Sequence, residues 1–202
     1  MTEEMGRRER KKLATRHALI DAAVELFTEQ GFEKTTVAQI AERADVSTRT
    51  FFLHFATKED VLAGEGDARV ELGLKVIAER VPGEGPDEAF ARAMRAMIDD
   101  GEPEETELGR LRYRMALESP SVRANLLRRR HEAERLFAAA LLEQFPDELD
   151  EIGANATVAA VMAATYAAAI TSLTRGRPME AIQDAMHRAV DIGMWGRRRK
   201  DR

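Results

Sequence analysis

The stretch of residues 35–62, TTVAQIAERADVSTRTFFLHFATKEDVL, decides how the front of this chain folds. Thr36 stands three residues before Gln39, which is the spacing of a capping box at the start of a helix. Ser47 is a favoured N-cap for a second helix, which carries two inward-facing phenylalanines four residues apart, Phe51 and Phe55. Two short helices joined by a tight turn have the helix-turn-helix pattern of major-groove readers, although a short helix pair also occurs in small helical domains that bind nothing.

The residues on either side of this stretch predict further helices. An apolar stripe at steps of three and four indicates a first helix that ends at Gly31; its members are Leu13, His17, Ile20, Val24 and Phe27. After the stretch, Thr57 and Asp60 resemble another capping box, and apolar spacing extends a long fourth helix toward Pro82. Later helices are expected near 87–99, 104–118, 120–144, 152–174 and 179–194.

No window of the sequence alternates apolar and polar residues for the length of a strand, so the fold class is all-α with about nine helices. The chain divides into a basic amino-terminal arm at 1–12, a three-helix helix-turn-helix domain at 13–60 and a helical domain at 61–202. Its 202 residues are enough for one large or two small domains.

Charge is spread unevenly along the chain. The whole chain carries a formal net charge of −5, yet residues 7–58 hold 10 Lys and Arg against 7 Asp and Glu. A basic front on an acidic protein suggests a segment that faces a polyanion, while a merely solvated charge run needs no partner. The chain has no cysteine, and its charged first 12 residues lack the apolar run of a secretory signal, so we expect a cytoplasmic protein.

Residues 152–174 carry no formal charge and are long enough to cross a bilayer. Their many alanines, diluted by Asn155 and several threonines, instead indicate a helix buried inside protein. We expect no membrane partner. Where one chain cannot cover such a helix a second copy will, which predicts a homodimer joined through the last two helices of each subunit.

The quoted stretch resembles the DNA-binding segment of the TetR/AcrR transcriptional regulators, and the match extends over residues 13–63. It rests on the motifs Val46-Ser47, Phe51-Phe52, His54-Phe55 and Lys58-Glu59. The resemblance implies a ligand-responsive regulator with an amino-terminal DNA-binding domain and a carboxy-terminal domain for effector binding and dimerisation. It also implies double-stranded operator DNA as partner, with near-palindromic half-sites about one helical turn apart.

Carried over by position, the resemblance places Thr48, Arg49, Thr50, Phe52 and Leu53 at the major groove. Ser47, His54 and Lys58 then lie near phosphates, and Thr36 joins this DNA-facing set. Helical spacing agrees in part, because Phe52 and Leu53 face away from Phe51 and Phe55. Arg49 is the side chain able to bind guanine through two hydrogen bonds, and an exposed Leu53 suits a thymine methyl group as well as it suits plain solvent.

The sequence departs from the family pattern at three positions. Asp45 stands where glycine is usual in the turn, which Asp tolerates because it adopts the left-handed conformation. Arg49 replaces a frequent glycine, and Phe52 replaces a frequent tyrosine whose hydroxyl could bond a phosphate. The basic residues between Arg7 and Lys12 form an arm that reaches DNA or is merely solvated.

The second domain carries the flexible apolar side chains that an adaptable effector pocket uses. The candidates are Phe90, Met94, Met97, Tyr113, Arg114, Leu117, Met162 and Tyr166, and core packing is the competing interpretation for each. Residues 108–117 and the helix after Ser119-Pro120 resemble family members that sense acyl-CoA thioesters. The effector is therefore expected to be an acyl-CoA-like or other largely apolar compound.

A helical-bundle enzyme or metal-binding protein is the alternative. Such a protein needs a constellation of carboxylates and histidines, yet only one of the four histidines, His187, follows an acidic residue at the Asp/Glu-x-x-His spacing, with Asp184. No phosphate-binding glycine loop, nucleophile elbow or cysteine nucleophile is present in the sequence. Together with the resemblance to the TetR/AcrR regulators, this predicts a homodimeric transcriptional repressor with no catalytic residues, no metal and no cofactor beyond its effector.

Overall fold

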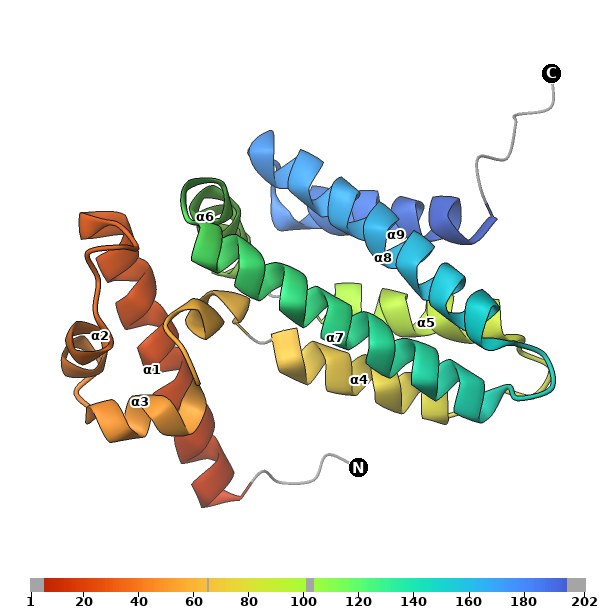
Figure 1. Ribbon diagram of the computed structural model, residues 1–202, viewed down its shortest axis with the longest axis horizontal. Helices are drawn as coiled ribbons and strands as arrows, with labels where there is room; N and C mark the ends of the chain where they lie inside the picture. The colour runs from red at the N-terminus through yellow and green to blue at the C-terminus, as the bar shows by residue number, and fades with distance from the viewer. Residues whose placement is uncertain (1–5, 65, 101–103, 196–202) are drawn as a thin grey trace. The chain divides into compact units, whose positions relative to one another are not determined.

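The computed structural model describes residues 6–64, 66–100 and 104–195, which form nine α-helices and one short 3₁₀ helix (Figure 1). The all-α prediction is confirmed, and no strand occurs in those ranges. The elements are α1 (Arg7–Gln30), α2 (Val37–Arg43), α3 (Thr48–His54), η1 (Glu59–Ala63), α4 (Gly66–Ala78), α5 (Pro86–Asp99), α6 (Glu104–Glu118), α7 (Pro120–Gln144), α8 (Glu151–Thr174) and α9 (Met179–Trp195). The five helices expected after residue 82 begin and end within a residue of the predicted positions.

The helices gather into two compact units. The amino-terminal unit runs to Gly64 and also takes in Leu111–Asn125, which covers the end of α6 and the start of α7. The larger unit comprises Glu65–Arg110 and the chain from Leu126 onward. Residues 111–125 thus join the amino-terminal unit, whereas the division made from sequence places them in the second domain.

The buried face of α1 is rotated relative to the predicted stripe. Ile20 and Phe27 are buried as expected, but Leu19, Ala23 and Leu26 complete the face, and His17 is exposed. The helix ends at Gly31, whose φ of +83° is readily adopted by glycine. Beyond it the chain folds back, so that the ring of Phe32 lies 5.0 Å from that of Phe27.

The prediction of one long fourth helix is wrong in one respect, because the helical run is interrupted at Gly64. Asp60 does close a turn by accepting hydrogen bonds from the Thr57 amide and hydroxyl, at 3.0 and 2.8 Å. The helical run that follows is only the short 3₁₀ helix η1, with Val61 and Leu62 fully buried. At Gly64 the backbone takes φ +58°, and α4 begins afresh at Gly66. A positive φ is costly for residues with a Cβ atom, so this glycine ends the run.

The larger unit is a helical bundle in which α4 packs on α5, α5 on α9, and α8 on α9 (Figure 1). Its core includes the side chains of Phe90 and Phe137, whose rings are tilted relative to each other with centroids 5.6 Å apart. Gly73 permits α4 to approach this core, since a Cβ atom there would lie 2.6 Å from the Met97 sulfur and 2.9 Å from Phe137. The tight contact leaves no room for a side chain at position 73.

Helices α8 and α9 pack closely against each other in the larger unit. A Cβ atom on Gly193 would lie 2.8 Å from the Val161 Cα atom, so the two backbones touch at this glycine. Helix α8 is long and apolar enough to cross a membrane, but only 28% of its most apolar window is buried within the chain. The buried side includes Ala154, Val158 and Val161, and the opposite side is solvent-exposed.

Candidate nucleic-acid interface

Helices α2 and α3 have the predicted caps at both starts. The Thr36 hydroxyl accepts a hydrogen bond from the Gln39 amide at 3.2 Å, and the Gln39 side chain accepts one from the Thr36 amide at 2.9 Å. At α3 the Ser47 hydroxyl accepts from the Thr50 amide at 3.0 Å. These caps satisfy amide groups that the short helices leave without partners, and so they fix where each helix begins.

The turn between α2 and α3 depends on Asp45. Its φ of +53° makes it the one non-glycine residue with a positive φ in the described ranges. The left-handed conformation lets the Val46 amide reach back to the Ala41 carbonyl at 2.9 Å. The prediction that Asp replaces the usual turn glycine at a left-handed position is confirmed.

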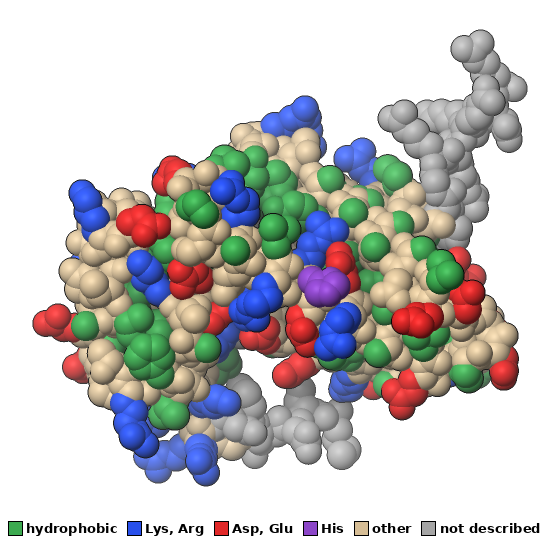
Figure 2. Space-filling view, in the orientation of Figure 1, with side chains coloured by type: hydrophobic (Ala, Val, Ile, Leu, Met, Phe, Trp, Pro, Cys, Tyr) green, Lys and Arg blue, Asp and Glu red, His purple; other side chains and the backbone are tan. Residues whose placement is uncertain are grey.

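Helix α3 separates its side chains into an inner and an outer face. Phe51 and Phe55 are buried, with ring centroids 5.7 Å apart, and anchor the helix in the amino-terminal unit. Phe52 and Leu53 point outward with 57% and 72% of their surfaces exposed. On the face shown in Figure 2, hydrophobic side chains gather over the part of the molecule where Figure 1 draws α3.

The polar members of the predicted DNA-facing set lie at the start of α3. Ser47, Thr48 and Arg49 are exposed, and the hydroxyls of Ser47 and Thr50 share a hydrogen bond of 2.9 Å. Arg49, Phe52 and Leu53 are separated by three and four residues, so they share one helical face. That outer face therefore carries a guanidinium group at one end and two large apolar groups at the other.

His54 lies at the end of α3 and is half-buried. Its Nδ1 atom is buried and has no hydrogen-bond partner among the described residues. Its backbone carbonyl accepts a hydrogen bond of 3.1 Å from the Arg16 guanidinium, which also stacks 4.3 Å above the Phe55 ring. Burial, followed by the positive charges of Arg16 and Lys12, lowers the pKa of the His54 imidazole and favours its neutral form.

Lys58 has a structural role that the sequence did not indicate. Its Nζ atom donates hydrogen bonds to the carbonyl oxygens of Phe32 and Thr35, at 2.7 and 2.9 Å. The same ammonium group sits 4.1 Å from the centroid of the Phe32 ring. Since a lysine has three N–H donors, at most one remains for a phosphate. Its predicted phosphate contact remains a prediction.

The basic residues between Arg7 and Lys12 belong to the first turns of α1, so this part of the predicted arm is helical. Their side chains are exposed where the structure describes them. A helix holds these cations at fixed spacing, which an extended arm would not do.

The junction of α6 and α7 contributes contacts that sequence reasoning missed. The Ser119 hydroxyl donates to the Glu33 carboxylate at 2.8 Å, and the Ser121 hydroxyl donates to Glu59 at 2.9 Å. The Asn125 amide group donates to the Asp60 carboxylate at 3.0 Å. All three bonds lie inside the amino-terminal unit. Ser119-Pro120 marks a helix start in the sequence, but nothing in it reveals a partner 86 residues away.

The eight predicted effector residues fall in both units. Phe90 and Met94 are buried in the core of the larger unit, and Met97 and Met162 pack against that core. Tyr166, in the same unit, is 51% exposed, and the Arg130 guanidinium lies 5.5 Å from the centroid of its ring. Tyr113, Arg114 and Leu117 belong to the amino-terminal unit, where Leu117 is 62% exposed. The effector pocket remains a prediction.

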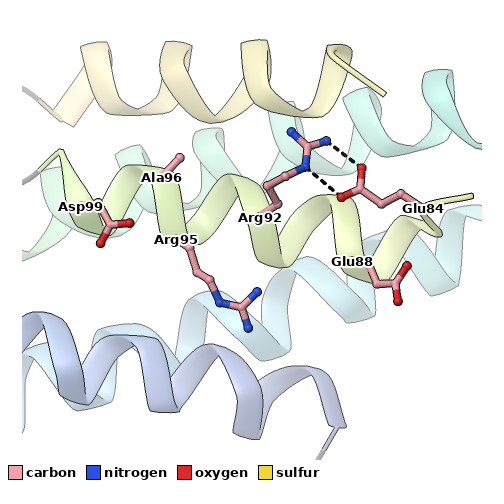
Figure 3. A pocket seen from close by; sticks show the side chains of 6 residues that line it. All are labelled: Glu84, Glu88, Arg92, Arg95, Ala96 and Asp99. Atoms are coloured by element: carbon pink, nitrogen blue, oxygen red, sulfur yellow. Dashed lines mark hydrogen bonds and ion pairs between the residues drawn. The ribbon is translucent and has the colours of Figure 1, made fainter. Parts of the chain in front are cut away.

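A hollow of about 550 Å³ beside α5 differs from the predicted apolar pocket in its lining. Its lining is mostly charged, as Figure 3 shows: Glu84, Glu88, Arg92, Arg95, Ala96 and Asp99. Arg92 binds Glu84 through two hydrogen bonds of 2.7 and 2.8 Å and also donates to the carbonyls of Val76 and Glu79 at the end of α4. The bonds from Arg92 lower the pKa of the Glu84 carboxyl. This group holds α4, α5 and their loop together.

In the part of the chain that the structure describes, no group of three or more Asp, Glu or His side chains is placed to hold a metal ion. His187 and Asp99 do pair at 2.8 Å, as one of several contacts between α9 and α5.

Comparison with known proteins identifies the family. The family model described as "Bacterial regulatory proteins, tetR family" matches residues 19–64, and the model described as "MftR C-terminal domain" matches residues 84–194. The HTH-type transcriptional regulator TcmR of Streptomyces glaucescens is 40% identical over 151 residues, which cover 72% of this chain and 67% of the relative. The chain belongs to the TetR family of transcriptional regulators.

Solved structures agree on the fold. The fatty acid degradation regulator FadR of Bacillus halodurans aligns with a TM-score of 0.63 at 16% identity, covering 98% of this chain and 100% of that one. Thermus thermophilus FadR, a TetR-family repressor solved in complex with lauroyl-CoA, gives a TM-score of 0.56 at 23% identity and covers 93% of this chain and 97% of that one. Membership of the TetR family makes the helix-turn-helix the DNA-binding element, and the protein is a regulator rather than an enzyme.

Proposed function

We propose that this protein is a homodimeric, cytoplasmic repressor that binds a near-palindromic operator and leaves it when a small-molecule effector binds. The outer face of α3 is the observation that carries the proposal. It presents Arg49, Phe52 and Leu53 to solvent on a helix anchored by buried Phe51 and Phe55. A rigid helix with one bidentate donor and two apolar groups outward suits the reading of base edges in a major groove.

The exposed side of α8 supports the dimer. Five of its solvent-facing residues are alanines at helical spacing, and Ile152 and Tyr166 flank them: Ala156, Ala159, Ala160, Ala163 and Ala167. Small side chains let two helices pack with their backbones close together. A second copy of the chain would cover this apolar side and place two α3 helices on one duplex.

Helices α6 and α7 could carry the effector signal to the DNA-binding unit, because both helices have residues in each of the two units. Helices α6 and α7 each begin in one compact unit and end in the other. Inside the amino-terminal unit, the junction between them is hydrogen-bonded to Glu33, Glu59 and Asp60. An effector that prefers one arrangement of α6 and α7 would shift the population of the DNA-binding arrangement by its differential affinity.

The effector is proposed to be an acyl-CoA-like or other largely apolar compound. The core of the larger unit contains Met94, with Met97 and Met162 packed against it, and methionine side chains rearrange readily around an apolar guest. The Thermus thermophilus relative in complex with lauroyl-CoA supports a thioester as the first compound to test.

Selection from a random duplex library with the full-length protein tests the proposal. We expect a near-palindromic site with half-sites about one helical turn apart, and a dimer in sedimentation. Ala163→Arg should give a monomer with much weaker operator binding, because it places a charge on the α8 face. Ala139→Arg, at an exposed alanine of α7, is the matched control and should change neither property. Selection of no specific duplex would overturn the proposal.

Titration of the operator complex with lauroyl-CoA tests the effector class, with free coenzyme A as its control. Release by lauroyl-CoA alone supports an acyl-CoA-like effector. A complex that both compounds leave intact, while another apolar metabolite releases it, would overturn the thioester assignment and keep the regulator.

A further inference from the structure

The outer face of α3 carries an unusual pair of side chains for a surface that meets DNA. Phe52 and Leu53 are adjacent, and both are mostly exposed. Phe52 rests edge-on against the buried Phe51 ring, with centroids 5.4 Å apart, so its direction is fixed by the core. The Phe52 ring offers no hydroxyl to a phosphate, and neither side chain can donate or accept a hydrogen bond.

The surroundings of this pair favour a nucleic acid over an apolar protein partner. Arg49 shares the outer face, and exposed Ser47 and Thr48 stand at its start. The amino-terminal stretch of residues 7–58 carries a surplus of positive charge in an otherwise acidic chain. An apolar pair set among a cation and hydroxyl groups suits a polyanion that has apolar points on it.

The major groove offers one such point. Among the groups that the four bases display there, donors and acceptors dominate, and the C5-methyl group of thymine is the apolar one. We propose that Phe52 and Leu53 read thymine methyl groups in each operator half-site, beside the base pair contacted by Arg49. This inference rests on the proposed function and adds the chemical identity of the bases that the apolar half of α3 recognises.

Replacing thymine by deoxyuridine tests the inference, because it removes the methyl group and keeps the base pair. Duplexes selected by the full-length protein are resynthesised with one thymine at a time changed to deoxyuridine, and binding is measured at constant salt. We expect one or two positions in each half-site to weaken binding about four-fold per methyl group, the effect of withdrawing one buried methyl-sized group from contact.

Two variants assign the readout to side chains. Leu53→Ala and Phe52→Ala should bind the thymine site more weakly and should lose the preference for thymine over deoxyuridine at the position that each residue contacts. Leu127→Ala is the matched control, because Leu127 on α7 is 61% exposed and lies outside α3. It should keep the full preference. Circular dichroism melting verifies that each variant is folded.

The outcomes separate the inference from the function on which it rests. A selected site that binds equally well with deoxyuridine at every thymine would overturn the methyl readout and leave the regulator intact. A methyl preference that survives in both α3 variants would overturn the assignment to Phe52 and Leu53. Failure to select any specific duplex would overturn the proposed function, and the inference with it.

Discussion

Helices α3 and α8 both expose apolar side chains, but they differ in the size of what they expose. Seven-residue α3 presents two large side chains, Phe52 and Leu53, above a buried pair of phenylalanines. Helix α8 has 24 residues and presents five alanines on its exposed side, flanked by Ile152 and Tyr166. Large, fixed side chains suit recognition of separate small groups, whereas a low, even surface suits the approach of another helix.

Exposed apolar residues therefore do not all serve the same kind of contact in this protein. On α3 the exposed pair is surrounded by polar and basic groups, and on α8 the exposed face is long and uncharged. The first arrangement is proposed to meet DNA and the second to meet a copy of the chain. Substitutions at matched positions on these and neighbouring helices test this distinction.

The largest effect is expected at Phe51, the inner neighbour of Phe52. Phe51→Ala removes a fully buried ring and should lower the free energy of unfolding by about 3 to 5 kcal/mol, while Phe52→Ala should cost less than about 1 kcal/mol. Urea unfolding with hydrogen exchange across α1 to α3 measures both. Equal losses in the two variants would contradict the division of α3 into an inner and an outer face.

The next effect is expected where α8 meets α9. Gly193→Ala would place a Cβ atom 2.8 Å from the Val161 Cα atom. Because this nearest atom belongs to the backbone, it cannot move away as a flexible side chain would. The free energy of unfolding should fall by about 2 to 3 kcal/mol. Gly66→Ala, where nothing lies within 4 Å, is the control and should leave stability unchanged or slightly raised. Thermal melting of both proteins decides the matter.

A smaller effect is expected at Arg49, the polar end of the α3 face. Arg49→Ala should reduce discrimination at one base pair by about 2 kcal/mol. Arg49→Lys keeps the charge but lacks the planar fork, so it should retain general affinity for DNA and lose the same discrimination. Competition between operator variants at fixed salt measures both, and an unchanged base preference in Arg49→Ala would refute the role.

The smallest effect is expected from His54. Burial and the charges of Arg16 and Lys12 hold its pKa below the usual value of a histidine, about 6.5, in the folded protein. The unfolded chain therefore binds the proton more tightly, and stability declines as the pH falls through that value. His54→Gln should flatten the loss of melting temperature between about pH 7.5 and about pH 5.5. An unchanged slope in His54→Gln would contradict this assignment.

The sequence predicted the local features of the helix-turn-helix well. The cap residues Thr36 and Ser47, the left-handed Asp45 and the inward Phe51 all lie where their spacing places them. Each of these depends on interactions within a few residues, which is why a pattern in one segment suffices.

Other features escaped sequence reasoning because they depend on partners far away in the chain. Lys58 has the positive charge of a phosphate ligand, yet its ammonium group donates hydrogen bonds to carbonyl oxygens 23 and 26 residues earlier in the chain. The bond of Asn125 to Asp60 spans 65 residues. The break at Gly64 was missed because apolar spacing continues across it, and only the backbone conformation reveals the interruption.

By itself the sequence determined the helices, their caps and the division of α3 into a buried and an exposed face, because hydrogen bonds and side-chain periodicity within a helix are local. Only the tertiary structure decided that the α6–α7 junction belongs to the amino-terminal unit, that Lys58 bonds to the fold, and that one side of α8 is exposed among the described residues. Those facts depend on packing between distant segments, which periodicity cannot encode.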